Sequence, residues 1–590
     1  MIHHAPRRPR VDLSGYWHGS LSLNPDIDVA APAAIERDFF IPLSWNRQIE
    51  DLRWPGEGTE LSGIVTPLQN QNFRHIMRKF NEGVIVYRRA VNIALPTGDL
   101  RAALVFEGSN YHTTVTINDQ HIGAHDGGHL AFEFDITDAL RDGENHIEIT
   151  VDNHRRKDAA PQEQFNWQNY GGVYRPVYVE WRPHVHVADW SATPGRDHEG
   201  WYVDVTPHAA GDEAATVEVT LNSGDDVQSA TIRHGATERI RLLRPRLWQP
   251  GVGGMSRITL RAGDDVVTGS FGVRTVEMHD GKVHINGQPM RLLGAALHEQ
   301  HATFGSSVPG WQSDYDIALM KQAGLNAVRT AHYPHAQSFY DACDRAGVLV
   351  VADLPCWQFN SYHFDRPAMR DLCCDYARQM VAQFGHHPCI VGWLIQTESD
   401  TFEPGAYDFF KAIHDAFKAA DPVRFTLSAE SPYPPQHLEV VKQVRDQPHE
   451  AIPRTSEFID AFGVNNYAGW YSDKADFFDR TLDHVHGKLD GKAMFVTEFG
   501  GEGILGQRDL TMAPWTEDYQ AALIARHMRA ILEREHIAGF FLWLFADYQC
   551  ASIGIRAINA KGLVDEHRRP KLAFDTVRSL LTQGEPPAAR

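Results

Sequence analysis

From about residue 278 onward, apolar segments of strand length alternate with longer helical patterns, and this alternation restricts the possible folds most strongly. Helices are expected over residues such as 314–322, 336–345 and 518–533. Strands that are buried on both faces and separated by helices are typical of a (β/α)8 barrel. Eight strand candidates fit this arrangement: 291–297, 326–332, 348–354, 390–398, 424–429, 461–467, 493–499 and 539–547. The sequence therefore predicts a TIM barrel over residues 278–590.

The residues before the barrel follow a different pattern, in which short segments of alternating apolar and polar residues are separated by turn residues. Runs at 84–93, 113–117 and 146–151 indicate an antiparallel β-sandwich. A second stretch of such segments, over about residues 185–277, has a length that suits a small immunoglobulin-like β-sandwich. We therefore expect a multidomain chain with a first sandwich over 1–184, an immunoglobulin-like sandwich over 185–277 and the barrel over 278–590.

The charge balance restricts the partners. The chain has 56 lysine and arginine residues against 76 aspartate and glutamate residues, which gives a formal net charge of −20. This charge opposes binding to nucleic acid or to an anionic membrane, so neither is an expected partner. No segment reaches the ~20 apolar residues of a transmembrane helix, and the N-terminus lacks the apolar core of a secretory signal. The six cysteines form no Cys-x-x-Cys pair, which favours reduced thiols in a cytoplasmic protein.

Two carboxylates end buried strands of the predicted barrel. Glu398 ends the fourth strand, and Glu498 lies at the end of the seventh. A charge in such a place is costly unless it is paired or used in chemistry, and either glutamate alone could be a salt-bridged loop residue. As a pair, they indicate a general acid and a nucleophile that face one bond, as in retaining glycosidases, whose carboxyl groups lie about 5–5.5 Å apart.

Other polar and aromatic side chains are expected at the same end of the barrel. Tyr467 ends the preceding strand and is expected to donate a hydrogen bond to Glu498. Trp543 is expected to form the floor under a sugar ring. His298 and His332 are expected to bind the sugar or to orient Glu498.

Nearly the whole chain resembles glycoside hydrolase family 2 and, within it, the β-glucuronidases. The similar segments are 12–17, 87–89, 127–132, 169–176, 329–334, 387–398 and 497–500. The resemblance implies that the first sandwich is a sugar-binding-like jelly roll, from which Asn166 reaches the site. It also implies retaining hydrolysis, with Glu398 as the acid/base and Glu498 as the nucleophile.

A short motif after the eighth strand bears on the substrate. Asn559-x-Lys561 is similar to the pair with which β-glucuronidases bind the sugar carboxylate, and Arg556 is expected to assist it. A lysine charge and an amide donor suit a uronate in an acidic protein. The alternative is a solvated loop lysine.

Two positions depart from the family pattern. Thr397 stands where the family has an asparagine that binds the sugar 2-hydroxyl. This substitution predicts either slow turnover of plain glucuronides or a substrate altered at O2. The loop at 356–365 is short, which predicts an open mouth that accepts an oligosaccharide or another large aglycone, with Trp357 as a stacking or packing residue.

The favoured interpretation is an exo-acting β-glucuronidase that acts on a carbohydrate uronide. A β-galacturonidase, a neutral-sugar enzyme of the β-galactosidase type and a noncatalytic carbohydrate-binding homologue remain alternatives. No cofactor or metal is expected, because no His-Glu-x-x-His is present and the Gly-x-Gly-x-x-Gly match at 501–506 precedes no helix start. Related enzymes are often homo-oligomers, and the resemblance makes this a possibility here.

Overall fold

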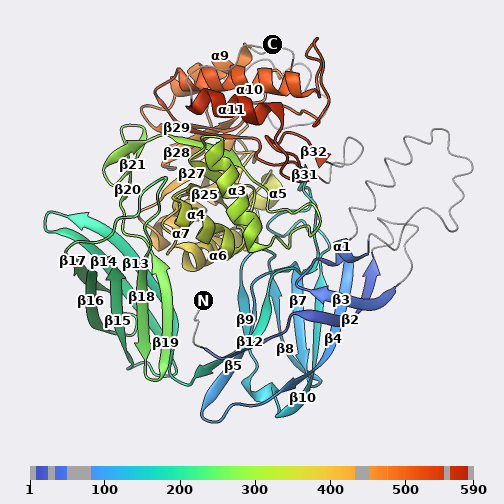
Figure 1. The fold of residues 1–590 in the computed structure, drawn as a ribbon, viewed down its shortest axis with the longest axis vertical. Coiled ribbons are helices and arrows are strands. Elements are labelled where there is room, and N and C mark those ends of the chain that lie inside the picture. The colour runs from blue at the N-terminus through green and yellow to red at the C-terminus, as the bar shows by residue number, and fades with distance from the viewer. Residues whose placement is uncertain are drawn as a thin grey trace, which may run out of the picture.

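The computed structural model describes residues 8–23, 34–49, 82–431, 452–472, 474, 476–550 and 558–582. Figure 1 shows a barrel surrounded by helices in the upper part of the molecule. Two groups of β-sheets lie below it, with the earliest strands at the lower right and the next group at the lower left. This order along the chain agrees with the predicted succession of two sandwiches and a barrel.

Eight parallel strands close into the barrel, which confirms the main prediction. The first strand pairs with the last through Leu292 and Gly539, and this pairing closes the sheet. Nearly every strand residue is buried, because helices cover the outer face and side chains fill the interior. The strands are β23 (Leu292–Ala296), β24 (Ala327–Thr330), β25 (Leu349–Asp353), β26 (Ile390–Thr397), β27 (Phe425–Glu430), β28 (Ala461–Asn465), β29 (Ala493–Glu498) and β30 (Ile537–Leu542).

The helices between these strands bury one apolar face against the barrel. One of them, α7 (Ala406–Ala420), buries Phe409, Phe410, Ile413 and Phe417, which recur at helical spacing. Thr516 caps another, α10 (Glu517–Leu532), by accepting a hydrogen bond from the backbone of Tyr519. The others are α3 (Gly310–Gln322), α4 (Gln337–Ala346), α5 (Ser361–Phe364), α6 (Pro367–Phe384), α9 (Phe477–His486), α11 (Leu572–Thr582) and the 3-10 helix η3 (Arg454–Glu457).

The N-terminal region contains a six-stranded sheet, in the order β3-β2-β4-β10-β7-β8, and a four-stranded sheet, in the order β1-β12-β5-β9. Trp17, Phe39, Tyr87 and Phe106 are buried in its core. The strands are β1 (Arg10–Asp12), β2 (Gly15–Leu23), β3 (Ile35–Ile41), β4 (Gly83–Ile93), β5 (Leu100–Phe106), β7 (His112–Ile117), β8 (Gln120–Asp126), β9 (Phe132–Asp135), β10 (Gly143–Asp152) and β12 (Val177–Pro183). Shorter elements are α1 (Trp45–Gln48), η2 (Thr137–Ala139) and the pair β6 (Ser109–Asn110) and β11 (Gly172–Val173).

The second group forms a three-stranded sheet, β13-β14-β17, and a four-stranded sheet, β16-β15-β18-β19. This arrangement agrees with the small sandwich expected from the sequence. The strands are β13 (His186–Asp197), β14 (Gly200–Ala210), β15 (Thr216–Ser223), β16 (Asp226–Arg233), β17 (Glu238–Leu242), β18 (Ser256–Ala262) and β19 (Asp265–Phe271). A small sheet of β20 (Val276–His279), β21 (Lys282–Ile285) and β22 (Gln288–Met290) precedes the barrel. The domain boundaries at 184 and 277 remain predictions.

Buried polar contacts join the N-terminal sheets to the barrel. Arg175 forms an ion pair of 2.5 Å with Glu299, and both side chains are buried. The hydroxyl of Tyr170 donates a hydrogen bond of 3.2 Å to Gln549 Oε1. Trp167 forms a β-bridge with Cys550. These contacts hold the loop that carries Asn166 against the barrel.

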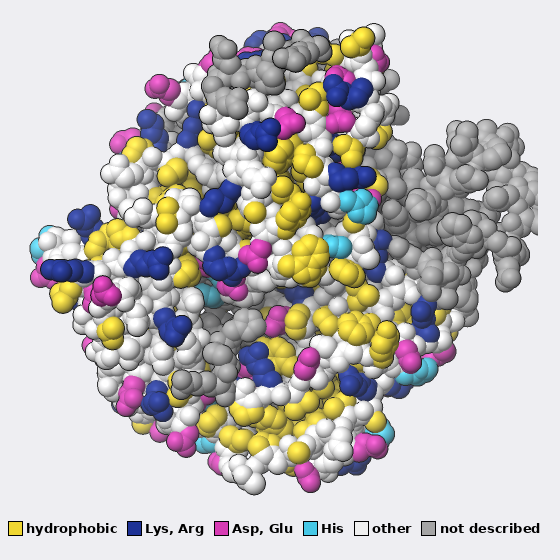
Figure 2. Space-filling view, viewed as in Figure 1, with side chains coloured by type: hydrophobic (Ala, Val, Ile, Leu, Met, Phe, Trp, Pro, Cys, Tyr) yellow, Lys and Arg dark blue, Asp and Glu magenta, His cyan; other side chains and the backbone are white. Residues whose placement is uncertain are grey.

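Figure 2 shows basic and acidic side chains interspersed on one face of the molecule, so the acidic excess does not gather into a single patch there. Among the described residues, no helix has both the length and the apolar character needed to cross a membrane.

Candidate active site

A cavity of about 260 Å³ lies at the carboxyl end of the barrel strands. Its walls come from the barrel, from β31 (Tyr548–Gln549), from β32 (Ile558–Asn559) with the residues just after it, and from the N-terminal region. The described lining residues are Asn166, His332, Trp357, Gln358, Glu398, Ser431, Asn465, Tyr467, Tyr471, Glu498, Trp543, Tyr548, Asn559 and Lys561. The sequence prediction that both glutamates face one site agrees with this placement.

Glu498, the last residue of β29, has a buried carboxylate with two hydrogen-bond donors. Tyr467 donates a bond of 2.6 Å to Oε2, as the sequence predicted, and Arg329 donates one of 3.0 Å to Oε1. Burial raises the pKa of Glu498 to about 7, opposed by Arg329 and Tyr467 and reinforced by the charge of Glu398. Both glutamates line the same cavity, so the charge on one disfavours ionisation of the other.

Arg329, in β24, does not line the cavity, but its guanidinium contacts several side chains around the site. Its guanidinium is fully buried and forms an ion pair of 2.8 Å with Asp353. The same guanidinium donates a bond of 2.7 Å to the hydroxyl of Thr397 and lies 3.2 Å from His332 Nδ1. Arg329 therefore links the strands that carry the two glutamates.

Glu398 directly follows β26 and is half-buried at the cavity wall. Asn465 Nδ2 donates a bond of 3.0 Å to Glu398 Oε1, and Gln358 Nε2 donates one of 3.3 Å to Oε2. The hydroxyl of Thr497 donates a bond of 2.7 Å to Asn465 Oδ1, so the Asn465 amide must present its NH2 group to Glu398. Each carboxylate oxygen of Glu398 therefore has an amide partner.

Lys561 places a buried positive charge in the cavity wall. Its Nζ donates a bond of 3.0 Å to the hydroxyl of Tyr471 and lies 3.4 Å from Glu502 Oε1. The ammonium also lies 5.4 Å from the ring centre of Tyr467 and 5.7 Å from that of Trp470. Among the described residues that line the cavity, Lys561 is the only lysine or arginine.

Aromatic and amide groups complete the walls. The imidazole of His332 stacks on Trp543 with ring centres 4.8 Å apart. Burial and the Arg329 guanidinium hold the pKa of His332 well below its usual value, so the ring is neutral. His332 Nδ1 lies 3.2 Å from Arg329 Nη2 and 3.5 Å from Asp353 Oδ2. Asn166 Oδ1 is buried without a hydrogen-bond partner among the described residues.

The structure brings most of the predicted site residues together. Eight of them line the cavity: Asn166, His332, Glu398, Tyr467, Glu498, Trp543, Asn559 and Lys561. His298 and Thr397 do not line it. The His298 ring stacks on Tyr548, 4.0 Å between centres, and the hydroxyl of Thr397 faces Arg329. Arg556 lies outside the described residues.

The sequence places Arg329 and Asn465 among the polar groups at the ends of the predicted barrel strands, where a site is expected, but assigns them no individual role. The structure shows their contacts with the two glutamates. Gln358 lies in a loop, and no pattern in the sequence pointed to it.

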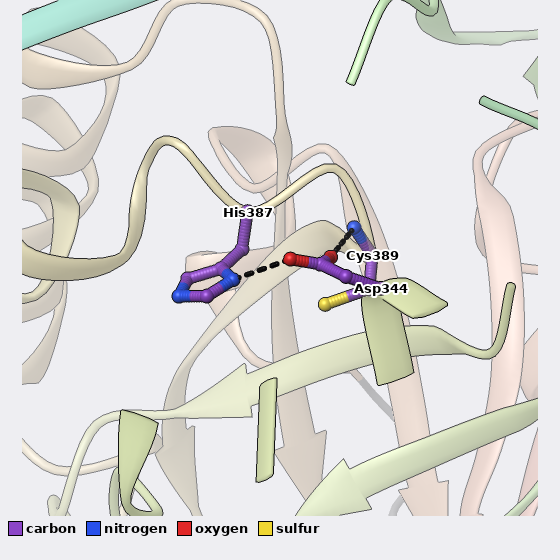
Figure 3. Close-up of side chains that lie close together, drawn as sticks. All are labelled: Asp344, His387 and Cys389. Carbon is purple, nitrogen blue, oxygen red and sulfur yellow. Dashed lines mark hydrogen bonds and ion pairs between the residues drawn. The ribbon is translucent and has the colours of Figure 1, made fainter. Parts of the chain in front are cut away.

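A cluster of possible metal ligands lies elsewhere among the described residues and consists of Asp344, His387 and Cys389, all buried (Figure 3). His387 Nδ1 donates a bond of 2.6 Å to one oxygen of Asp344, and the backbone N–H of Cys389 donates one of 2.9 Å to the other. Both oxygens of Asp344 are therefore occupied. We assign the cluster a structural role, in which it joins α4 to the start of β26.

A barrel whose cavity holds two glutamates from different strand ends, with amide and aromatic walls, has the architecture of a glycoside hydrolase. A family model described as the TIM barrel domain of glycosyl hydrolases family 2 matches residues 276–584, more than half of the chain. A second, described as a galactose-binding domain-like domain of glycosyl hydrolase 2, matches residues 60–194. The chain belongs to glycoside hydrolase family 2 and is a glycoside hydrolase.

Several known proteins are similar over most of their length. A β-glucuronidase from Paenibacillus borealis is 26% identical over 527 residues, which cover 82% of this chain and 85% of the relative. The β-glucuronidase of Bifidobacterium dentium, solved with coumarin-3-O-glucuronide, has a TM-score of 0.83 at 24% identity, with 99% of this chain and 98% of that chain covered. A β-galacturonidase from Eisenbergiella tayi has a TM-score of 0.80 at 22% identity and covers 98% and 97%. At these identities, the solved structures establish the fold.

Proposed function

We propose that this enzyme is a retaining, exo-acting β-glucuronidase that releases terminal β-D-glucuronic acid from a glucuronide or an oligosaccharide. One observation carries the proposal: a single buried lysine, Lys561, lies in the wall of the cavity that holds Glu398 and Glu498. The names of the relatives support the same assignment.

In the first step, Glu498 attacks the anomeric carbon and Glu398 gives its proton to the leaving glycosidic oxygen. The bond from carbon to the leaving oxygen breaks as the bond to the Glu498 carboxylate forms, so a covalent glycosyl-enzyme results. Arg329 and Tyr467 support this role of Glu498, because both donate hydrogen bonds that stabilise its ionised form.

In the second step, Glu398 acts as a general base and takes a proton from water, whose oxygen attacks the same carbon. The bond to Glu498 breaks, glucuronic acid leaves with its β-configuration, and Glu398 is again protonated. The amides of Asn465 and Gln358 stabilise the ionised form of Glu398 between the two steps.

In this proposal, Lys561 and Asn559 bind the sugar carboxylate. A net-acidic protein needs a local cation to hold an anion, and the cavity supplies one. His332 offers a neutral ring at the cavity wall, and Asn166 offers a buried acceptor without a partner among the described residues, both suited to sugar hydroxyls. Trp543 and Tyr548 supply apolar surface for the sugar ring. A cavity of about 260 Å³ suits one terminal sugar, which favours exo action.

The location, the partner and the assembly of the enzyme are part of the same proposal. All six cysteines are buried and no disulfide is present among the described residues, which supports a reducing, cytoplasmic location. A carbohydrate uronide is the proposed partner, and a homo-oligomer is the proposed assembly. Size-exclusion chromatography with light scattering tests the assembly.

A panel of 4-nitrophenyl β-glycosides tests the substrate assignment. We expect hydrolysis of the glucuronide with a kcat/KM at least about 100-fold above those of the galacturonide, galactoside and mannoside. Faster hydrolysis of the galacturonide or of a neutral sugar would replace the proposed substrate. No hydrolysis of any member would favour a noncatalytic carbohydrate-binding protein.

A further inference from the structure

The loop after β25 lies beside the chain that follows β26, and backbone hydrogen bonds fix the two segments against each other. Thr397 N donates to Cys356 O at 2.9 Å, and Gln358 N donates to Thr397 O at 2.8 Å. Further along, Asp400 N donates to Phe359 O at 2.8 Å. These backbone hydrogen bonds continue the pairing of β25 with β26 beyond the ends of the two strands. They place Gln358 beside Glu398 and restrict the backbone at both residues.

Gln358 and Glu398 share a backbone conformation that is unusual for residues other than glycine. Each has a φ of 51°, in the left-handed region. Residues held in this region are unfavourable by themselves and persist where the surrounding structure imposes them, commonly at functional sites. Here the two left-handed residues face each other, and their side chains are hydrogen-bonded through Gln358 Nε2 and Glu398 Oε2.

The side-chain amides of Asn465 and Gln358, which both contact Glu398, differ in their freedom to rotate. Thr497 fixes the Asn465 amide as a donor to Oε1. No comparable bond to the Gln358 amide oxygen is present among the described contacts, so this amide is able to turn. A proton that Glu398 gives to a substrate therefore resides on Oε2, since Oε1 already accepts from Asn465.

We propose that Gln358 is the positioning residue for the acid/base Glu398 and follows its protonation state by turning its amide. With Glu398 protonated, the Gln358 carbonyl accepts the Oε2 proton and holds it at the cavity wall. After this proton passes to the leaving oxygen, the Gln358 NH2 group donates to the new carboxylate, as in the present structure. Gln358 itself neither gains nor loses a proton. The inference rests on the proposed role of Glu398.

The test compares two substrates that differ in their need for an acid. A 2,4-dinitrophenyl leaving group departs without a proton, whereas a phenyl leaving group requires one. For Gln358→Met, which keeps the length but removes the amide, we expect kcat/KM to fall at least about tenfold more on the phenyl glucuronide than on the dinitrophenyl glucuronide. A charge-assisted hydrogen bond of ordinary strength corresponds to a factor of about ten or more.

A second variant separates the amide from the backbone. Gln358→Gly also removes the amide, and glycine adopts a φ of 51° without steric cost. We expect the same difference between the two substrates as for Gln358→Met. If either folded variant loses activity equally on both substrates, or keeps full activity on the phenyl substrate, the proposal is wrong.

Two reference variants complete the experiment. Gln162→Met removes a buried amide that contacts the same loop through the backbone oxygen of Trp357. We expect it to change kcat/KM on the phenyl and dinitrophenyl substrates by the same factor. Glu398→Gln is expected to show the largest difference between the losses of kcat/KM on the two substrates. If Glu398→Gln shows no difference, the proposed acid/base role fails. If it shows one and the Gln358 variants do not, only the role of Gln358 fails. Where glucuronides are not the substrate, the same two leaving groups are used on the sugar that is hydrolysed.

Discussion

The phenolic hydroxyl of Tyr467 donates a hydrogen bond of 2.6 Å to Glu498 Oε2, and both side chains are buried in the wall of the cavity. Glu498 is the last residue of β29, and Tyr467 follows β28, so the barrel register itself brings the pair together. The bond favours the ionised carboxylate, which is the form that attacks a sugar carbon.

Tyr467→Phe removes this donor while keeping the ring. The pKa of Glu498, which burial raises to about 7, should then rise further, because the carboxylate loses a bond that stabilises only its charged form. We expect the acidic limb of the kcat/KM profile to move up by about one pH unit. An unchanged limb would show that Tyr467 does not support the charge of Glu498. The thermal midpoint of the variant serves as the control for folding.

Lys561→Met should remove the affinity for the sugar carboxylate. We expect kcat/KM on the aryl glucuronide to fall by about 100-fold or more, because a charge-assisted contact is lost. Hydrolysis of a neutral aryl galactoside should change far less, which provides the internal control. Equal losses on both substrates would instead assign Lys561 a structural role through its ion pair with Glu502.

Thr397→Asn tests the departure from the family pattern. The Thr397 hydroxyl accepts a bond of 2.7 Å from Arg329 and does not line the cavity, so we expect it to supply no direct contact to the sugar 2-hydroxyl. Turnover of a simple aryl glucuronide should be slow in the native enzyme and should increase in the asparagine variant. A full native rate that asparagine does not improve would reject this expectation and the idea of a substrate altered at O2.

Arg175→Met tests the contact between the N-terminal sheets and the barrel. The variant leaves Glu299 as a buried charge without its ion-pair partner, which typically costs about 3–5 kcal/mol. We expect the thermal midpoint to fall by several degrees and KM to rise, because Asn166 lies on the loop held there. In the double variant with Glu299→Gln, the two effects should not add. Additive losses would show that the pair does not act as a unit.

The barrel and its two glutamates were predictable because both depend on local signals. Apolar strand segments, turn residues between them and a polar residue at each strand end are visible along the chain. The position of Lys561 followed from a motif in register with the eighth strand.

The remaining site residues depend on which strands become neighbours. Arg329, in β24, acts as a link because β25, β26 and β29 place Asp353, Thr397 and Glu498 around it, and no spacing in the sequence specifies this. His298 has the strand-end position of a site residue, but Tyr548 covers it. Gln358 acts through a loop whose left-handed turn is imposed by contacts with the chain around Thr397.

Covalent labelling tests the central claim most directly. The enzyme is incubated with 2-deoxy-2-fluoro-β-D-glucuronyl fluoride, digested, and its peptides are mapped by mass spectrometry, with Glu498→Gln as the control. The account predicts one fluoroglucuronyl group on Glu498, loss of activity at the same rate, and no label in the variant. A label on Glu398 or on another residue, or hydrolysis with inversion and no covalent species, would contradict it.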